Sequence, residues 1–135
     1  MIYLNENLNQ ITHSGWGEFE SGFVWSTNRY SSLLMPIDKQ DDAFGIQLVV
    51  EPFLVDGGLK QQEIEIFCNG LFVLGSVSSI TRKEILFFEV HPSLSAFGSL
   101  KIDFRFPKAV SPKELQLSDD MRTLGYKFFE LQIII

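Results

Sequence analysis

The segment Glu63-Ile-Glu-Ile-Phe-Cys68-Asn69-Gly70-Leu71-Phe-Val-Leu74 holds two apolar runs on either side of an Asn-Gly pair. Asn and Gly tolerate the positive φ angles of a two-residue type I′ turn, so the segment predicts a β-hairpin. In the register that this turn sets, Phe67 faces Phe72 and Cys68 faces Leu71. Side chains then divide between two faces, since successive residues of a strand point to opposite sides. The core face is expected to hold Ile64, Ile66, Cys68, Leu71 and Val73, and the outer face Glu63, Glu65, Phe67, Phe72 and Leu74.

Alternation of apolar and other residues predicts further strands along the chain. The clearest lie at residues 100–106, 44–51 and 84–90, with a last strand that ends at Ile135. The doubled Phe128-Phe129 in that last strand predicts a bulge. Short strands separated by turn signals indicate an all-β fold, an antiparallel β-sandwich of jelly-roll type. We expect residues 1–135 to form a single β-sandwich domain.

One short helical turn is expected near residues 111–116. Ser111 can act as the N-cap, Pro112 fits the first helical position, and Glu114 completes a capping box. The polar block that follows, Ser118 to Arg122, leads into the last strand.

Charge and composition limit the function. The formal net charge is −6, which argues against a nucleic-acid surface and a polybasic membrane patch, because both need clustered Lys and Arg. Cys68 is the single cysteine, so no intramolecular disulfide can form. The start lacks a secretory signal, and no apolar run approaches the roughly 20 residues of a membrane helix. We therefore expect no membrane insertion and a cytoplasmic location, or one at the inner membrane through a partner.

No pattern of a catalytic or metal site stands out. His13 and His91 lie far apart, without Cys, Asp or Glu at metal-ligand spacing, so no metal and no cofactor are expected. Glu18 and Glu20 could share one side of a strand. A glycosidase needs carboxyls on both sides of the scissile bond, roughly 5–9.5 Å apart, so a hydrolase is the least favoured interpretation. The sequence predicts a protein that is not an enzyme, although a role as an accessory domain of one stays open.

Aromatic residues could offer flat faces to sugar rings, with polar groups beside them to bond hydroxyls. These residues are Trp16, Trp25, Tyr30, Phe67 and Phe72. A core position is the alternative, and it is preferred for the two tryptophans because aromatics are highly buried on average. The predicted ligand-binding residues are Trp16, Trp25, Phe67 and Phe72 for their rings, and Glu20, Asp103, Arg105 and Arg122 for their polar groups.

Asp120 and Arg122 allow two interpretations. Residues two apart in an extended segment share a side, so they could pair with each other or with Glu20. The preferred interpretation is a structural clamp that joins the two ends of the chain through Glu20, Asp120 and Arg122, because Arg suits bidentate carboxylate pairs. The alternative is a polar site for a glycan or a partner.

Two segments together resemble a known family. They are Gly15-Trp16-Gly-Glu-Phe-Glu20-Ser-Gly22-Phe-Val-Trp25-Ser26 and Ser111-Pro-Lys-Glu-Leu-Gln-Leu-Ser-Asp-Asp-Met-Arg-Thr-Leu-Gly125. They resemble the β-sandwich accessory, carbohydrate-binding-like domain of bacterial cell-surface glycan glycosyltransferases and phosphoglycerol transferases. Glu20, Trp25, Asp120 and Arg122 match its signature positions. The chain departs from the family pattern at Val24, where Arg is frequent, and at Gln116, where Gly is frequent.

The resemblance implies a non-catalytic carbohydrate-binding-like module that works with bacterial surface polysaccharide synthesis. Its partners would be a glycan, together with a glycosyltransferase or a second copy of the chain, and no nucleic acid. The alternative is a structural or protein-interaction module without a glycan site, which docks or self-associates through Phe67 and Phe72.

Overall fold

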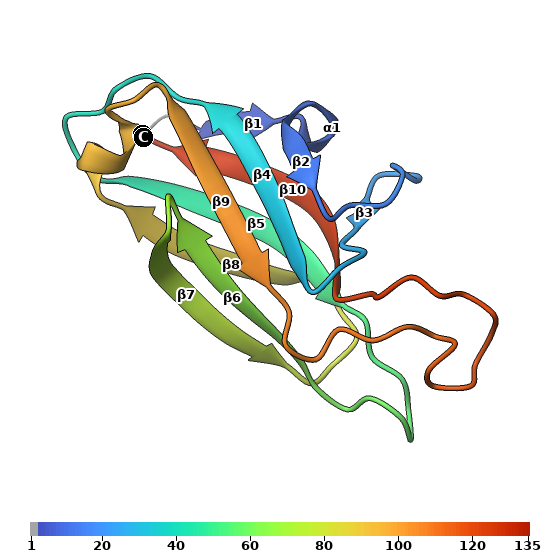
Figure 1. Ribbon diagram of the computed structural model, residues 1–135. Helices are drawn as coiled ribbons and strands as arrows, with labels where there is room; N and C mark the ends of the chain where they lie inside the picture. The colour runs from blue at the N-terminus through green and yellow to red at the C-terminus, as the bar shows by residue number, and fades with distance from the viewer. Residues whose placement is uncertain (1–2) are drawn as a thin grey trace.

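Two antiparallel five-stranded sheets lie face to face in the computed structural model (Figure 1), which describes residues 3–135, with side chains from residue 7. The β10 sheet has the order β1-β10-β5-β8, with β3 also paired to β10. The β9 sheet has the order β2-β4-β9-β6-β7. The strands are β1 (Tyr3–Glu6), β2 (Thr12–Ser14), β3 (Val24–Trp25), β4 (Tyr30–Pro36), β5 (Phe44–Pro52), β6 (Gln62–Cys68), β7 (Leu71–Ser78), β8 (Glu84–Val90), β9 (Ser99–Arg105) and β10 (Tyr126–Ile134).

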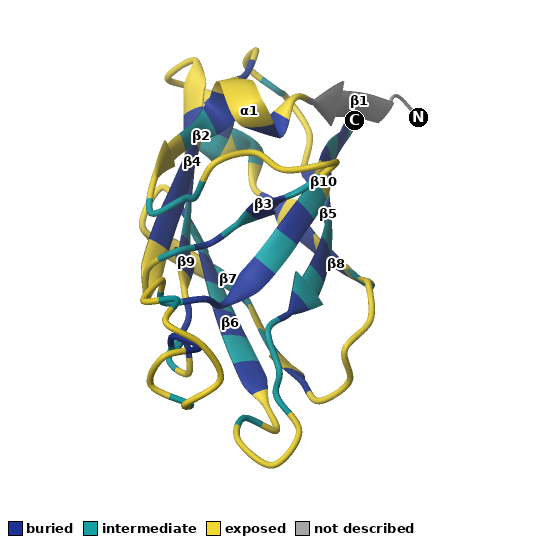
Figure 2. Ribbon diagram, turned by 90° about the vertical axis from the view of Figure 1, so that its right-hand side faces the viewer, coloured by how far each residue is buried: buried dark blue, intermediate teal, exposed yellow. Residues whose placement is uncertain are grey.

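The predicted antiparallel β-sandwich is confirmed, and the alternation of the sequence explains its core. Inward and outward side chains alternate along β4, β5, β6, β8, β9 and β10, apart from a bulge in β10, and nearly all of the inward ones are buried. Figure 2 shows the resulting dark blue bands along the strands and the mostly exposed loops between them. The inward side chains of the two sheets form one hydrophobic cluster, in which Phe104, Phe106, Tyr126 and Phe128 are the largest fully buried members. Burial of this apolar surface is the main stabilising contribution to the fold.

The hairpin of β6 and β7 has the predicted register at its turn. Phe67 pairs with Phe72 and Cys68 with Leu71, and the turn residues Asn69 and Gly70 have φ angles of 46° and 85°. A register shift follows between Ile66 and Phe67.

On β7 the extra residue is Val73, and it reverses the facing of the strand beyond it, which moves Leu74 from its predicted side. Leu74 pairs with Ile66 and packs partly against the core, and was wrongly placed on the outer face. Leu71 was expected in the core but is 59% exposed beside the turn.

The bulge predicted from Phe128-Phe129 is confirmed, since the pairing of β10 with β5 shifts between Phe128 and Glu130. Beyond it, the last strand ends at Ile134, close to its expected end.

The turn at residues 111–116 forms with Ser111 as its cap. The Glu114 amide donates to Ser111 Oγ at 3.1 Å, and the Leu117 amide donates to the carbonyl of Pro112 at 3.0 Å. Gln116 closes the turn with a φ of 60°.

Two other helical segments complete the chain. The 3-10 helix η1 (Pro92–Ser95) lies in the loop after β8, and the helix α1 (Leu8–Ile11), which the sequence did not predict, begins at the N-cap Asn7. No helix in residues 3–135 has the length and hydrophobicity of a membrane span.

Candidate functional site

The two motif-bearing segments of the sequence meet in the fold at a joint formed by Trp16, Ser26 and Gly125. Strand β3 pairs with β10, with Trp25 opposite Lys127. Next to this pair, the Ser26 amide donates to the Tyr126 carbonyl at 2.9 Å, and the Tyr126 amide donates back to Ser26 Oγ at 3.0 Å. A Cβ at Gly125 would lie 2.9 Å from Ser26 Oγ and 2.9 Å from Phe106 Cγ. The joint therefore needs a small residue at position 125.

Trp16 packs into this joint rather than standing on the surface. Its ring meets Phe128 edge-on, with centroids 4.8 Å apart, and it packs against the hydrophobic core. Its Nε1 donates to the Ser32 carbonyl at 2.7 Å. Both the ring and its polar atom are thus engaged within the protein.

Trp25 is partly buried in an aromatic group beside β10. Its ring makes edge-on contacts with Phe23 at 6.4 Å and Phe53 at 5.9 Å between centroids. The Lys127 ammonium lies 5.2 Å from the centre of the Trp25 ring, within the range of a cation–π contact. The predicted ligand residue Trp25 therefore lies on a different side of the sandwich from Phe67 and Phe72.

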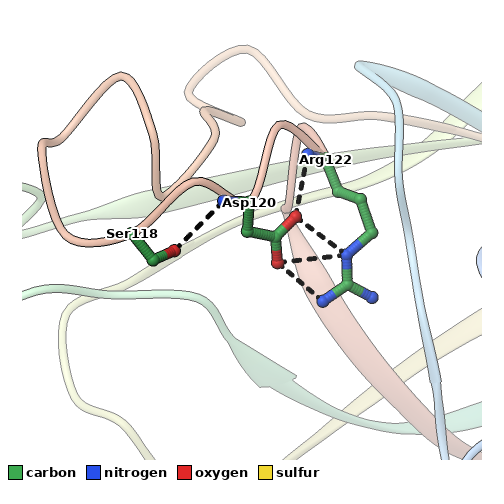
Figure 3. A network of polar contacts seen from close by, with 3 residues as sticks. All are labelled: Ser118, Asp120 and Arg122. Atoms are coloured by element: carbon green, nitrogen blue, oxygen red, sulfur yellow. Dashed lines mark hydrogen bonds and ion pairs between the residues drawn. The ribbon is translucent and has the colours of Figure 1, made fainter.

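Asp120 and Arg122 pair with each other in the loop before β10 (Figure 3). Arg122 Nη2 donates to Asp120 Oδ2 at 2.8 Å and Nε donates to both carboxylate oxygens at 3.1 Å. The hydrogen bonds from Arg122 hold the pKa of Asp120 below its ordinary value. The same bonds raise the pKa of Arg122, with a smaller contribution from the charge of Glu20.

Glu20 approaches this pair across a groove of about 420 Å³. The groove is lined by Gly17, Glu18, Phe19, Glu20, Thr27 and Arg122. Glu20 acts on Arg122 through its charge. Within the predicted clamp, Asp120 and Arg122 thus form a local pair. The hydrogen bonds that join the two segments run through Ser26 and Tyr126.

Four of the predicted ligand residues share the outer surface of the β9 sheet. We call this surface the β9 face. Arg105 lies opposite Tyr30 on β4 and opposite Glu65 on β6. Asp103 lies opposite Ser32 on β4 and opposite Phe67 on β6, and Phe67 faces Phe72 on β7. The face comprises Tyr30, Leu34, Glu65, Phe67, Phe72, Lys101, Asp103 and Arg105.

Aromatic rings flank the two sides of the β9 face. Phe67 and Phe72 meet edge-on with centroids 5.6 Å apart, and Phe72 is 59% exposed. On the other side Tyr30 is 63% exposed. Three strand spacings of about 4.8 Å separate β4 from β7, so the rings border a surface roughly 14 Å wide.

Paired charges fill the middle of the face. Arg105 Nη1 contacts Glu65 Oε1 at 2.8 Å, and Lys101 Nζ lies 3.7 Å from Asp103 Oδ1. Ser32 Oγ donates to Asp103 Oδ1 at 2.6 Å, which fixes the carboxylate. Each of these charged side chains is only partly buried, so it retains donors or acceptors for a ligand.

Cys68 lies under this surface and serves as packing. Its side chain is fully buried, and burial, with the nearby charge of Asp103, raises the pKa of its thiol to about 12. The thiol is thus neutral at ordinary pH and lacks the thiolate character of a nucleophile.

Tyr30, Glu65 and Lys101 belong to the face but were not among the predicted ligand residues. Lys101 and Glu65 could have been found, because each lies two residues from a predicted ligand residue of its own strand and so shares its side. These neighbours are Asp103 for Lys101 and Phe67 for Glu65. Tyr30 was considered for its ring, but its place on the face depends on the pairing of β4 with β9.

Comparison with known proteins shows a shared fold without a shared sequence family. No protein-family model and no curated protein matches the chain. A CBM36-1 domain of a multidomain xylanase from the hindgut metagenome of Trinervitermes trinervoides superposes with a TM-score of 0.62 and 9% identity, over 98% of this chain and 96% of that one. A carbohydrate-binding module CBM36 in complex with calcium and xylotriose gives 0.58 and 9%, over 98% and 99%.

A third similar structure is the much longer PorU of Porphyromonas gingivalis, with a TM-score of 0.52 and 13% identity. The match covers 78% of this chain but only 10% of PorU. The β-sandwich of this chain is therefore the fold seen in carbohydrate-binding modules. Within the described residues, no group of three or more His, Cys, Asp and Glu is placed to hold a metal ion.

Proposed function

We propose that this protein is a non-catalytic carbohydrate-binding module that holds its glycan on the β9 face. The observation that carries the proposal is the convergence of Phe67, Phe72, Asp103 and Arg105, from three strands, on one exposed sheet surface. The fold shared with carbohydrate-binding modules supports the same role.

The face offers both kinds of contact that a sugar ring needs. The rings of Phe67, Phe72 and Tyr30 provide flat apolar surfaces for the ring faces of the sugar. Arg105 and Lys101 can donate to hydroxyl oxygens, and Asp103 and Glu65 can accept from hydroxyl groups. Since the cations and carboxylates are paired with each other, the face favours an uncharged glycan over a polyanion.

The biological setting that we propose is bacterial surface polysaccharide synthesis, with a glycosyltransferase as the partner. It rests on the resemblance of the Gly15–Ser26 and Ser111–Gly125 segments to accessory domains of such enzymes. Sequencing the surrounding gene region tests it: a glycosyltransferase that is fused or adjacent would support the setting, and an unrelated neighbourhood would count against it.

Glycan binding is tested with an array of bacterial polysaccharides followed by titration calorimetry. We expect binding by the wild-type protein, and a loss of about tenfold or more in affinity for Phe72→Ala, since full burial of a Phe side chain contributes roughly 1.5–3 kcal/mol. Asp103→Asn should weaken binding as well, because it removes the charge that fixes hydroxyl donors.

The matched control is Phe97→Ala, because Phe97 is 87% exposed and lies outside the β9 face. This variant should bind as the wild type does. If none of the polysaccharides binds, or if Phe97→Ala weakens binding as much as Phe72→Ala, the proposed glycan site is wrong.

A protein-docking surface is the second candidate function for the same region. The exposed Leu71 and Phe72 beside Phe67 form an apolar corner that suits a protein contact. Light scattering on Phe67→Glu tests whether this corner joins two copies of the chain. A change in the mass of the assembly would favour docking, and an unchanged monomer would remove self-association through this corner.

A further inference from the structure

We propose that a second copy of this chain pairs with the free edge of β8, so that the two β10 sheets join into one continuous sheet. Strand β8 is hydrogen-bonded to β5 on one side, and in the described part of the chain no strand of its sheet lies on the other side. The outward amide and carbonyl groups of an edge strand are available for pairing with another strand.

The centre of strand β8 lacks the features that normally protect such an edge. It pairs with β5 over seven residues without a register shift, and its centre, Ile85-Leu-Phe-Phe88, contains no charge, glycine or proline. By contrast, β2 has three residues and a shifted register, and β7 contains Gly75 and faces a bulge. Long, regular and apolar edges are the ones that associate.

The exposed face of β8, together with the residue before the strand, presents Lys83, Ile85, Phe87 and Glu89 in sequence order. Ile85 and Phe87 are 67% and 50% exposed. The Phe87 ring covers Gly45 on β5, where a Cβ would lie 2.5 Å from the ring. Lys83 stands on the same side, since its ammonium lies 4.2 Å from the centre of the Phe129 ring. The edge thus runs from a cation, through two apolar side chains, to a carboxylate.

This order is complementary to itself in an antiparallel pair. With Leu86 opposite Leu86 of the second copy, Ile85 faces Phe87 of that copy and Lys83 faces Glu89. The two-fold axis repeats each contact, so the pair gains two apolar contacts and two opposite charges on one face. A register one residue away in either direction would turn the core side of the second copy's strand to the exposed side, and in one direction it would also bring Glu84 opposite Glu89. The facing of the strands and the two Lys83–Glu89 pairs together favour this register with a second copy of the chain.

Charge reversal tests this arrangement by sedimentation velocity and light scattering over a series of concentrations. We expect a reversible dimer of the wild type. Lys83→Glu and Glu89→Lys should each weaken it by about tenfold, because each places two like-charged pairs across the interface. The double variant with both changes should regain wild-type association. Ile85→Lys should weaken it further, as a charge then replaces the exposed apolar contact.

The control is Met121→Lys, because Met121 is 70% exposed in the loop before β10 and is not among the residues of the proposed contact. It should dimerise as the wild type does. Backbone amide exchange locates the contact: the outward amides of β8 should gain protection as the concentration rises, while those of β7 should not.

A monomer at every concentration would overturn the proposal, as would a double variant that stays as weak as the single ones. A dimer without added protection in β8 would also overturn it. The β9 face is not part of this edge, so glycan binding by the Lys83→Glu variant should equal that of the wild type, and the two proposals can fail independently.

Discussion

Two regions of the molecule restrict their residues differently: the joint between the two motif-bearing segments, and the β9 face. At the joint, Trp16, Ser26 and Gly125 are engaged by neighbouring backbone and rings, and position 125 has no room for a Cβ. On the β9 face, Tyr30, Phe72 and Arg105 keep much of their side chains in solvent. The most distinctive part of the sequence is therefore occupied with packing, and the proposed glycan site lies on strands outside the two motif-bearing segments.

This difference has a physical origin. A close approach of two backbones admits few residue types, so it leaves a recognisable motif in the sequence. A flat sheet face accepts any side chain that tolerates water, so its residues follow only the alternation of the strand. Variants at the joint should therefore change the free energy of unfolding, and variants on the β9 face should change binding.

Trp16→Ala should have the largest effect on stability. The change removes a ring that contacts Phe128 and leaves the Ser32 carbonyl without its donor. Large-to-small changes of buried aromatics cost about 3–5 kcal/mol, and we expect about 3 kcal/mol because Trp16 is only partly buried. Denaturant unfolding measures it, with Tyr30→Ala as the exposed aromatic control. Equal losses for both variants would contradict the distinction between the two regions.

Gly125→Ala should destabilise the fold by about 1–3 kcal/mol, the usual cost of overpacking. The added methyl group would meet Ser26 and Phe106, and both of these are buried. Gly58→Ala is the matched control, because a Cβ there would lie 3.5 Å or more from its neighbours, which is ordinary contact. Thermal unfolding of the two variants should separate them, and a Gly125→Ala protein as stable as the Gly58→Ala protein would show that the joint is loose.

Phe67→Ala and Phe72→Ala should have smaller effects on stability, and their effects should depend on each other. A cross-strand aromatic pair contributes about 0.5–1 kcal/mol, which a double-mutant cycle of unfolding free energies measures as the coupling. A coupling near zero would mean that the rings do not contact each other in solution. A loss as large as that of Trp16→Ala would show that the β9 face belongs to the core.

Features that depend on neighbouring residues in the sequence could be predicted before the structure. The Asn69-Gly70 turn fixed the pairing of Phe67 with Phe72, and Phe128-Phe129 indicated the bulge in β10. Leu74 was placed on the wrong side because the bulge between Phe72 and Leu74 reverses the facing of β7, and no residue type there signals it. Leu71 keeps its predicted pairing with Cys68 but is exposed beside the turn rather than in the core. Helix α1 was missed because its only signal is the N-cap Asn7.

The candidate site could be predicted only in part. Asp103, Arg105 and Phe67 alternate with core residues along their strands, so their outward direction was accessible from the sequence. Their proximity to Tyr30 depends on β9 lying between β4 and β6, a pairing of distant segments that local patterns do not encode. The role of the Glu20, Asp120 and Arg122 group as clamp or ligand site stays a prediction.

Gln116→Gly should have the smallest effect, and it should stabilise the protein. Gln116 holds a φ of 60°, the left-handed conformation in which a Cβ costs about 1–2 kcal/mol per residue and glycine is the usual choice at the end of a helical turn. Glycine also gains freedom in the unfolded chain, which offsets part of this, so we expect a gain of about 0.5–1 kcal/mol.

Asn69→Gly is the informative control, because Asn69 has a φ of 46° but its side chain donates to the Leu94 carbonyl at 3.1 Å and accepts from the Lys101 amide at 2.9 Å. Asn69→Gly should therefore lose stability where Gln116→Gly gains it. If both variants were stabilised, backbone strain would outweigh side-chain contacts at both turns, and the Asn69 side chain would not be holding the hairpin against η1 and β9.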